Sequence, residues 1–155
     1  MRRETKIIGV ISDTHGVLRA EALAALNGCD AIVHAGDIGK PAVLEMLAEL
    51  APLTAIRGNV DKWGTNLPDT AVLTLAGKRF YIIHNVKELE LDPRTAGFAA
   101  VISGHSHVPK SETRDGVLYL NPGSAGPRRF KLPVAVAKIR VREDGVEAEL
   151  ITLPA

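Results

Sequence analysis

The chain has 155 residues, of which 46% are hydrophobic and 24% are charged, and this composition excludes a mainly disordered protein. Its formal net charge of +1 gives no overall field that would favour nucleic acid or a membrane surface. It has one cysteine, Cys29, and no apolar run near the roughly 18 residues of a membrane span, so a disulfide scaffold and a transmembrane protein are excluded. We therefore expect a cytoplasmic protein with one domain over residues 1–155.

The first half of the chain alternates short apolar runs with amphipathic helical patterns. Apolar runs at 6–11, 31–33 and 53–56 predict buried strands. Between them, apolar residues three and four positions apart predict helices over 18–26 and 41–50, the second opening with a proline that suits the first helical turn. This βαβαβ order predicts a parallel sheet with right-handed crossovers.

The second half has short strands and tight turns. The predicted strands lie at residues 70–75, 79–83, 99–103, 111–113, 117–120, 134–141 and 146–153. Turns at Gly77–Lys78 and Asp144–Gly145 join neighbouring strands into hairpins. Residues 86–97 are weakly helical or irregular, with Pro93 interrupting them. We therefore expect an α/β protein, α+β in part, with two packed mixed sheets and helices outside them.

Side chains that can bind metal ions follow five of the predicted strands. They are Asp13, His15, Asp37, Asn59, His84, His105 and His107. In α/β proteins, sites form outside the carboxyl ends of the strands, so we expect these side chains to gather at one edge. Four of the five histidines in the chain belong to this set, which scattered surface histidines would not produce.

Two pairs in this set are two residues apart, Asp13 with His15 and His105 with His107. On an extended backbone such residues point to the same side, so each pair is predicted to bind one metal ion together. Mixed imidazole and carboxylate ligands favour Mn²⁺, Fe²⁺ or Zn²⁺ over Ca²⁺ and Mg²⁺. The set is too large for one tetrahedral ion and suits two ions that share a carboxylate.

The ordered motifs of the chain resemble those of a known family. They are Asp13-x-His15, Gly36-Asp37, Gly58-Asn59, His84 and Gly104-His105-x-His107. Together they resemble the calcineurin-like metallophosphoesterases over residues 6–124. Gly58-Asn-x-Asp61 and Asn121-Pro-Gly-Ser124 are similar to the small bacterial and archaeal phosphodiesterase branch. The resemblance implies a four-layer α/β/β/α fold, in which helices flank two packed sheets.

The resemblance also implies a role for each residue of the set. Asp13, His15 and His107 would bind one divalent ion, Asn59, His84 and His105 would bind the other, and Asp37 would bridge the two. Mn²⁺ is the expected ion, with Fe²⁺, Zn²⁺ or Ni²⁺ as alternatives. A hydroxide bridging the two ions would attack the phosphorus of a phosphodiester. The residues Asp37, Asn59 and His105 would act through metal and phosphate, and no general acid is assigned.

Two positions depart from the family pattern. Larger members have a histidine directly after the Gly-Asn pair, thought to assist the leaving group, where this chain has Val60. In many relatives a glycine follows the motif histidine, whereas here Asn85 follows His84. We therefore expect slower turnover and a preference for activated esters, and the geometry of the second metal position is open.

Other functions remain as alternatives on the same fold. One is a scaffold module with weak or no activity, similar to the small scaffold subunit of the retromer coat. Another is a phosphomonoesterase or nucleotide pyrophosphatase. The expected partner is a small phosphoester, which includes nucleotide-like substrates but not nucleic acid or a membrane, and the oligomeric state is open.

Several residues near the motifs have two interpretations each. His34 is predicted to support the site rather than bind a metal. Asp61 either positions the site or caps a loop. Residues 121–124 form a turn in the simpler interpretation and contact phosphate in the other. Trp63 is interpreted as a small core plug, with a base-stacking surface as the alternative.

A short basic stretch follows the turn at 121–124. It contains Arg128, Arg129 and Lys131. Such stretches usually form solvated surface, which is the preferred interpretation here, although a position near the site would attract an anionic substrate.

Overall fold

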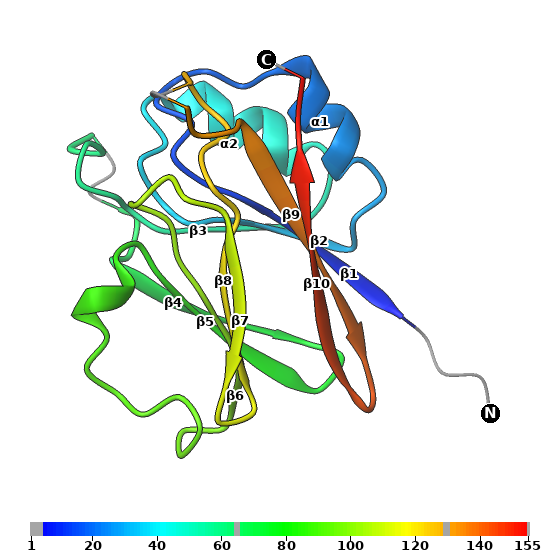
Figure 1. Ribbon diagram of the computed structural model, residues 1–155. Coiled ribbons are helices and arrows are strands. Elements are labelled where there is room, and N and C mark those ends of the chain that lie inside the picture. Colours follow the sequence, from blue (N-terminus) through cyan, green and yellow to red (C-terminus); the bar gives the residue numbers. More distant parts are fainter. Residues whose placement is uncertain (1–4, 64–65, 129–130, 155) are drawn as a thin grey trace.

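The structure, a computed structural model, describes residues 5–63, 66–128 and 131–154 and contains two five-stranded sheets (Figure 1). The first sheet has the order β10-β9-β1-β2-β3. Its strands are β1 (Lys6–Ile11), β2 (Ala31–His34), β3 (Leu53–Ala55), β9 (Ala135–Arg142) and β10 (Gly145–Thr152). β1, β2 and β3 run parallel, and the β9–β10 hairpin adds antiparallel strands at the β1 edge.

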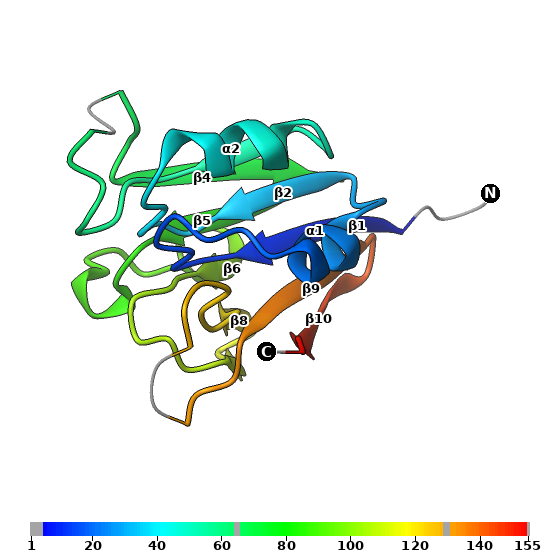
Figure 2. The ribbon, with the colours of Figure 1, turned by 90° about the horizontal axis from the view of Figure 1, so that it is seen from above.

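Both α-helices in the described residues lie on the outer face of the first sheet. α1 (Ala20–Leu26) connects β1 to β2, and α2 (Pro41–Ala48) connects β2 to β3. Two successive crossovers of the same hand in one direction place both helices on the same face. Their buried side chains pack on Ile11, Ile32 and other residues of this face, and Figure 2 shows both helices beside β1 and β2.

The second sheet has the order β4-β5-β6-β8-β7. Its strands are β4 (Thr70–Leu75), β5 (Lys78–Ile83), β6 (Phe98–Ile102), β7 (Lys110–Arg114) and β8 (Val117–Asn121). β5, β6 and β8 run parallel, while β4 and β7 are antiparallel edge strands. The expected pair of packed mixed sheets is therefore confirmed.

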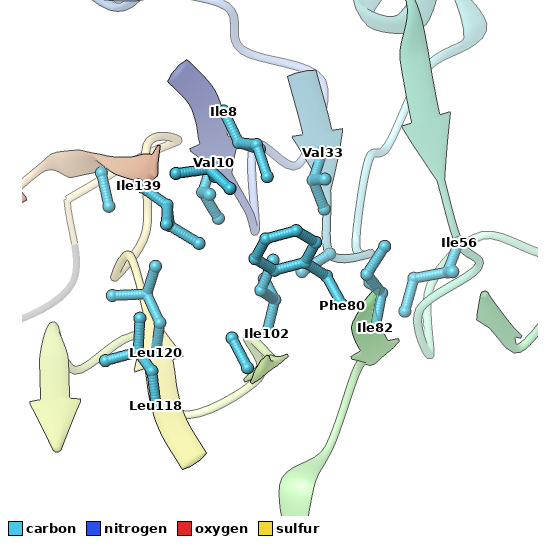
Figure 3. Close-up of a cluster of buried hydrophobic side chains, with 14 residues drawn as sticks. Ile8, Val10, Val33, Ile56, Phe80, Ile82, Ile102, Leu118, Leu120 and Ile139 are labelled. Carbon is cyan, nitrogen blue, oxygen red and sulfur yellow. The ribbon is translucent and has the colours of Figure 1, made fainter. Parts of the chain in front are cut away.

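The two sheets pack face to face over a layer of hydrocarbon side chains (Figure 3). Period-two alternation sends Ile8 and Val10 of β1 into this layer, while Ile11 faces the helices. Phe80 of β5 is fully buried near its centre, between strands of both sheets. This layer fixes the relative position of the two sheets, and so the position of the loops at their shared edge.

The outer face of the second sheet is covered differently from that of the first. The segment at 84–97 lies over it, and its one regular element is a 3₁₀ turn, η1 (Val86–Glu88). Val86 and Leu89 pack on Val101 and its neighbours. Among the described residues no α-helix covers this face, so of the two alternatives for 86–97 the irregular one is observed. None of the described helices has the length and apolarity to cross a membrane.

Candidate metal centre

The predicted metal-binding side chains gather where strands of both sheets end at one edge. Asp13 and His15 follow β1, Asp37 follows β2, and Asn59 follows β3. Figure 2 shows the arrowheads of β1 and β2 pointing to this edge. The remaining residues follow two parallel strands of the second sheet: His84 after β5, and His105 and His107 after β6. Because the strands named here run parallel within each sheet, their carboxyl ends lie at the same edge.

The side chains form two groups whose ligand atoms lie within 4.8 Å of one another in each group. The first group is Asp13, His15 and His107, in which His107 Nε2 lies 3.5 Å from Asp13 Oδ1. The second group is Asp37, His84 and His105. Two ligands that each lie about 2.1 Å from one ion are roughly 3.0–3.5 Å apart, so this spacing suits a metal ion in each group.

Asp37 connects the two groups through one oxygen. Its Oδ2 lies 3.2 Å from His84 Nε2 in the second group and 3.8 Å from His15 Nε2 in the first. Its other oxygen, Oδ1, accepts a hydrogen bond from the backbone N–H of Val60. This arrangement leaves Oδ2 facing both groups at once.

The prediction for the second histidine pair is wrong. His105 and His107 belong to different groups, whereas Asp13 and His15 share one as expected. The reason is the backbone, because His105 has φ 72° and His107 has φ 65°, both in the left-handed region. The same-side rule for residues two apart holds only for extended chain. His107 thus lies with Asp13 and His15, and His105 lies with Asp37 and His84.

Left-handed backbone is concentrated at this edge. Five non-glycine site residues have positive φ: Asp13, His15, Asp37, His105 and His107. In the described residues only Ala76 and Asp115, both in hairpin turns, share this feature. Each such residue costs about 1–2 kcal/mol, and such strain persists only where the surrounding structure imposes it. These turns aim the side chains inward from loops that leave the strands sharply.

Asp13 is fully buried and its two oxygens differ. Oδ2 accepts hydrogen bonds from Ser12 Oγ at 2.8 Å and from the backbone N–H of His105 at 3.1 Å. Oδ1 has no hydrogen-bond donor among the described residues. Burial raises the pKa of Asp13 from 3.8 to about 6. A buried acceptor without a donor is costly, and a cation at Oδ1 would relieve that cost.

His84 presents its Nε2 atom to Asp37. Its Nδ1 lies 2.7 Å from the carbonyl oxygen of Ala35, so Nδ1 carries the proton and donates it. Burial alone would lower the pKa of His84, but the Asp37 carboxylate and the Ala35 carbonyl raise it overall. Burial alone would raise the pKa of Asp37, but His84 lowers it well below its usual range. Nε2 is thus the atom at which a metal ion would compete with a proton.

Asn59 is exposed and lines the same cavity as His84. The glycine before it is required by a close approach, because a Cβ at Gly58 would overlap the backbone and Oδ1 of Asp37. Gly104 is similar, since its Cβ would lie 2.7 Å from Asp13 Oδ2. The two glycines therefore let neighbouring loops touch the carboxylates directly.

Asp61 is fully buried and ties two loops of the site together. Its Oδ2 accepts from the backbone N–H groups of Ile38 and Gly58, and its Oδ1 accepts from that of Gly39. The first loop carries Asp37 and the second carries Asn59. Of the two interpretations, the positioning role is the one observed.

His34 supports the site as a neutral residue. Its Nδ1 accepts a hydrogen bond from the N–H of Gly36, so Nε2 carries the proton and donates to Thr14 Oγ1 at 3.0 Å. Thr14 Oγ1 in turn donates to the carbonyl oxygen of Ile38. Burial lowers the pKa of His34 to about 3. The prediction that His34 supports the site is confirmed.

The turn at 121–124 is buried and is hydrogen-bonded to two loops of the site. Asn121 donates to the carbonyl oxygen of Gly104 and to Ser106 Oγ, and Ser124 Oγ donates to the carbonyl oxygen of Asp13. These bonds explain why a polar turn is buried. Ser12 and Thr14 were not singled out in the sequence, because small hydroxyl residues there resemble ordinary loop residues.

The residues with open roles take definite positions. Asn85 caps η1, its side-chain oxygen accepting from the N–H of Lys87. Trp63 is 38% exposed and donates to the carbonyl oxygen of Gly39, so its interpretation as a core plug is wrong. Arg128 and Lys131 are exposed, as solvated surface requires, and Arg129 lies outside the described residues.

Comparison with known proteins gives a consistent result. The family model of the calcineurin-like phosphoesterase superfamily domain matches residues 7–144. A probable metallophosphoesterase of Methanocaldococcus jannaschii is 35% identical over 96% of this chain and 82% of its own. One of Methanothermobacter thermautotrophicus is 32% identical over 94% of this chain and 91% of its own.

Solved structures share the fold at low sequence identity. A protein described as a novel archaeal phosphodiesterase superposes with TM-score 0.75 and 22% identity, covering 94% of this chain and 99% of its own. Vacuolar protein sorting 29 of Cryptosporidium parvum superposes with TM-score 0.76 and 15% identity, covering 94% of this chain and 96% of its own. At such identities, the likeness concerns the fold alone.

Proposed function

The chain belongs to the calcineurin-like phosphoesterase superfamily, and from that premise we propose that it is a dinuclear metal-dependent phosphodiesterase. The observation that carries the proposal is the position of Asp37 Oδ2 between the two groups of side chains. A single carboxylate oxygen facing both groups suits one ligand shared by two ions.

The ligand roles follow from the two groups. Asp13, His15 and His107 would hold one ion, and Asn59, His84 and His105 the other, with Asp37 shared. Two bound ions would lower the pKa of a bound water toward neutral pH, which provides a hydroxide nucleophile, and would neutralise charge on the phosphate oxygens. Mn²⁺ is the proposed ion, with Fe²⁺, Zn²⁺ or Ni²⁺ as alternatives, because the ligands mix imidazole and carboxylate.

The chain's own residues orient these ligands, but the side chain directly after Asn59 is one that cannot act as a general acid. The N–H of Val60 holds Asp37 Oδ1 while its side chain is 47% exposed. Valine cannot donate a proton, so the proton for the leaving oxygen would come from water or from another residue. Esters with good leaving groups should therefore react fastest.

Charge near the centre supports a diester over a monoester. Asn59 and His84 line a cavity of about 860 Å³ that also contains Asp69, Glu88 and Glu90. One cation, Arg57, also lines it and is hydrogen-bonded to Asp69. A phosphodiester carries one negative charge where a monoester carries up to two, so this wall disfavours the monoester more.

Metal removal and replacement test the proposal. The protein is stripped with a chelator, and Mn²⁺, Ni²⁺, Zn²⁺ or Mg²⁺ is added back before assay with bis(p-nitrophenyl) phosphate and p-nitrophenyl phosphate. We expect Mn²⁺ to restore diester hydrolysis above monoester hydrolysis, with two ions bound per chain. No hydrolysis with any ion, together with no bound metal, would favour the scaffold alternative.

An Asp37→Asn variant tests the shared ligand. Loss of several kcal/mol of metal-based stabilisation predicts a fall in kcat/KM of at least about 100-fold. Asp144→Asn, in the exposed turn between β9 and β10, is the matched control and should retain activity. Undiminished turnover by Asp37→Asn would refute the bridging role.

A further inference from the structure

A second cavity adjoins the candidate metal centre on the other side of Asn85. It has a volume of about 300 Å³, and Gly104 and His105 form part of its wall. The ring centroids of His105 and His84 are 5.2 Å apart, and His84 lines the larger, acidic cavity. The two cavities therefore flank one centre, and Asn85 lines both.

The smaller cavity carries the opposite charge to the larger one. Lys87, Lys110 and Arg114 line it. Glu112 offsets one of these charges, since its Oε2 lies 3.3 Å from Lys110 Nζ and 3.5 Å from Arg114 Nε. These ion pairs are largely exposed and therefore weak, which leaves both cations available to a ligand.

Strand register explains how the cations are presented. Lys110 and Arg114 are four residues apart on β7, so they lie on the same face of the second sheet. The guanidinium carbon of Arg114 lies 4.2 Å from the ring centroid of Tyr119 on the neighbouring strand. This contact restricts Arg114 before any ligand arrives, which lowers the entropic cost of binding.

The uncharged lining also suits an anion attached to an organic group. Ser106 Oγ accepts hydrogen bonds from the side chain of Asn121 and from the N–H of Val108, so its hydroxyl hydrogen remains to be donated. Val86, Val108 and the ring of Tyr119 supply apolar surface. A group with a short apolar part and a terminal anion matches this combination.

We propose that this cavity binds a second negatively charged group of the substrate, carried on the part of the phosphoester that is not cleaved off. The proposal rests on the proposed function and narrows its substrate class. The acidic cavity repels such a group, so the two cavities together fix which way the substrate lies across the centre. The leaving group then points to the acidic side and is neutral or cationic.

Two matched substrates test this orientation. They are p-nitrophenyl butyl phosphate and p-nitrophenyl 3-carboxypropyl phosphate, which share a leaving group and differ in one remote carboxylate. With the metal-loaded protein we expect kcat/KM to favour the carboxylate substrate by about tenfold at low salt, equivalent to about 1.4 kcal/mol. Because the cations are exposed, high salt should reduce this preference.

Variants at the cavity locate the source of the preference. Lys110→Ala combined with Arg114→Gln should bring the ratio of the two kcat/KM values near one, whereas Lys110→Arg should keep it. Lys87→Ala removes the third cation that lines the cavity, without changing the contact between Arg114 and Tyr119, and should lower the ratio on its own. Arg140→Gln, on β9 of the other sheet, is the control and should leave the ratio unchanged.

The possible failures are distinct. Hydrolysis of the butyl substrate without preference for the carboxylate, or full preference in the double variant, would overturn the assignment of the cavity alone. No hydrolysis of either substrate with any added ion would overturn the proposed function and this inference with it.

Discussion

The layer between the two sheets and the edge that carries the candidate metal centre are built on opposite principles. The layer contains only hydrocarbon groups, most of them in regular strands, with Phe80 fully buried near its centre. The edge carries carboxylates and imidazoles, several of them buried, and its backbone is left-handed at five of the site residues. Regular packing provides the stability from which strained, polar loops can be held in place.

The first prediction concerns the hydrocarbon layer. Phe80→Ala should lower the free energy of unfolding by about 3–5 kcal/mol, because it removes a fully buried ring and leaves a cavity. Chemical denaturation of the metal-free protein measures this change. Val72→Ala, at a position 48% exposed on the neighbouring strand, is the control and should cost far less.

If the two regions are as distinct as their chemistry indicates, the folded fraction of Phe80→Ala should have the kcat/KM of the unaltered protein at low temperature. A loss of activity without a loss of stability would show that the layer shapes the site directly, and the comparison would fail.

The second prediction concerns the polar edge, where support for the ligands can be removed without touching them. Asp61→Asn replaces one of two carboxylate oxygens by an NH₂ group, which cannot accept the backbone N–H bonds that join the loops of Asp37 and Asn59. We expect metal affinity and activity to fall about 10–100-fold, as is typical when residues that orient metal ligands are changed.

Titration calorimetry with Mn²⁺ and the diester assay measure the two effects of Asp61→Asn. Asp144→Asn in the exposed turn is again the control. Equal metal affinity for Asp61→Asn and the unaltered protein would show that the loops hold their positions without this carboxylate.

The sequence predicted the regular region better than the edge. Apolar runs located the strands closely, as at 6–11 and 70–75, because burial leaves a continuous or alternating pattern. The pairing of β9 with β1 was not predicted, since the pattern marks buried faces but does not identify the neighbouring strand. Residues 86–97 contain a single 3₁₀ turn, which Asn85 caps, and Pro93 disfavours a longer helix there.

At the edge, the sequence identified side chains that lie near one another but not their geometry. Strand ends brought six of the predicted residues into two groups, with Asn59 in a cavity that His84 also lines, and this required only topology. The division of His105 from His107 depends on positive φ at both, which a rule for extended chain cannot anticipate. Asp61 had two equal interpretations because the local sequence does not show whether its side chain is buried. In the structure it is buried and accepts three backbone N–H groups, but an exposed loop cap would have the same local sequence.

The last prediction uses pH to separate the buried polar network from the rest of the fold. His34 has a pKa of about 3 in the folded protein because it is buried, against 6.5 ordinarily. Between these values the unfolded chain binds a proton that the folded chain does not, so His34 makes stability fall as pH falls, by up to about 1.4 kcal/mol per pH unit below 6.5. Asp13 acts in the opposite direction between about 6 and 3.8, because the folded state binds its proton more tightly.

Because these contributions overlap, the difference between the unaltered protein and His34→Gln is the informative quantity. Glutamine does not titrate, so the variant should be less stable at pH 7.5 but lose less stability on going to pH 5, with both proteins kept metal-free by a chelator. Urea denaturation at the two pH values measures the difference. Parallel losses in both proteins would mean that His34 is protonated in the folded state, and the network from Gly36 through His34 to Thr14 would then need a charged ring at its centre. In a charged His34 both ring nitrogens carry a proton, so Nδ1 could not accept the hydrogen bond from the N–H of Gly36. The same experiment therefore also tests the direction assigned to that hydrogen bond.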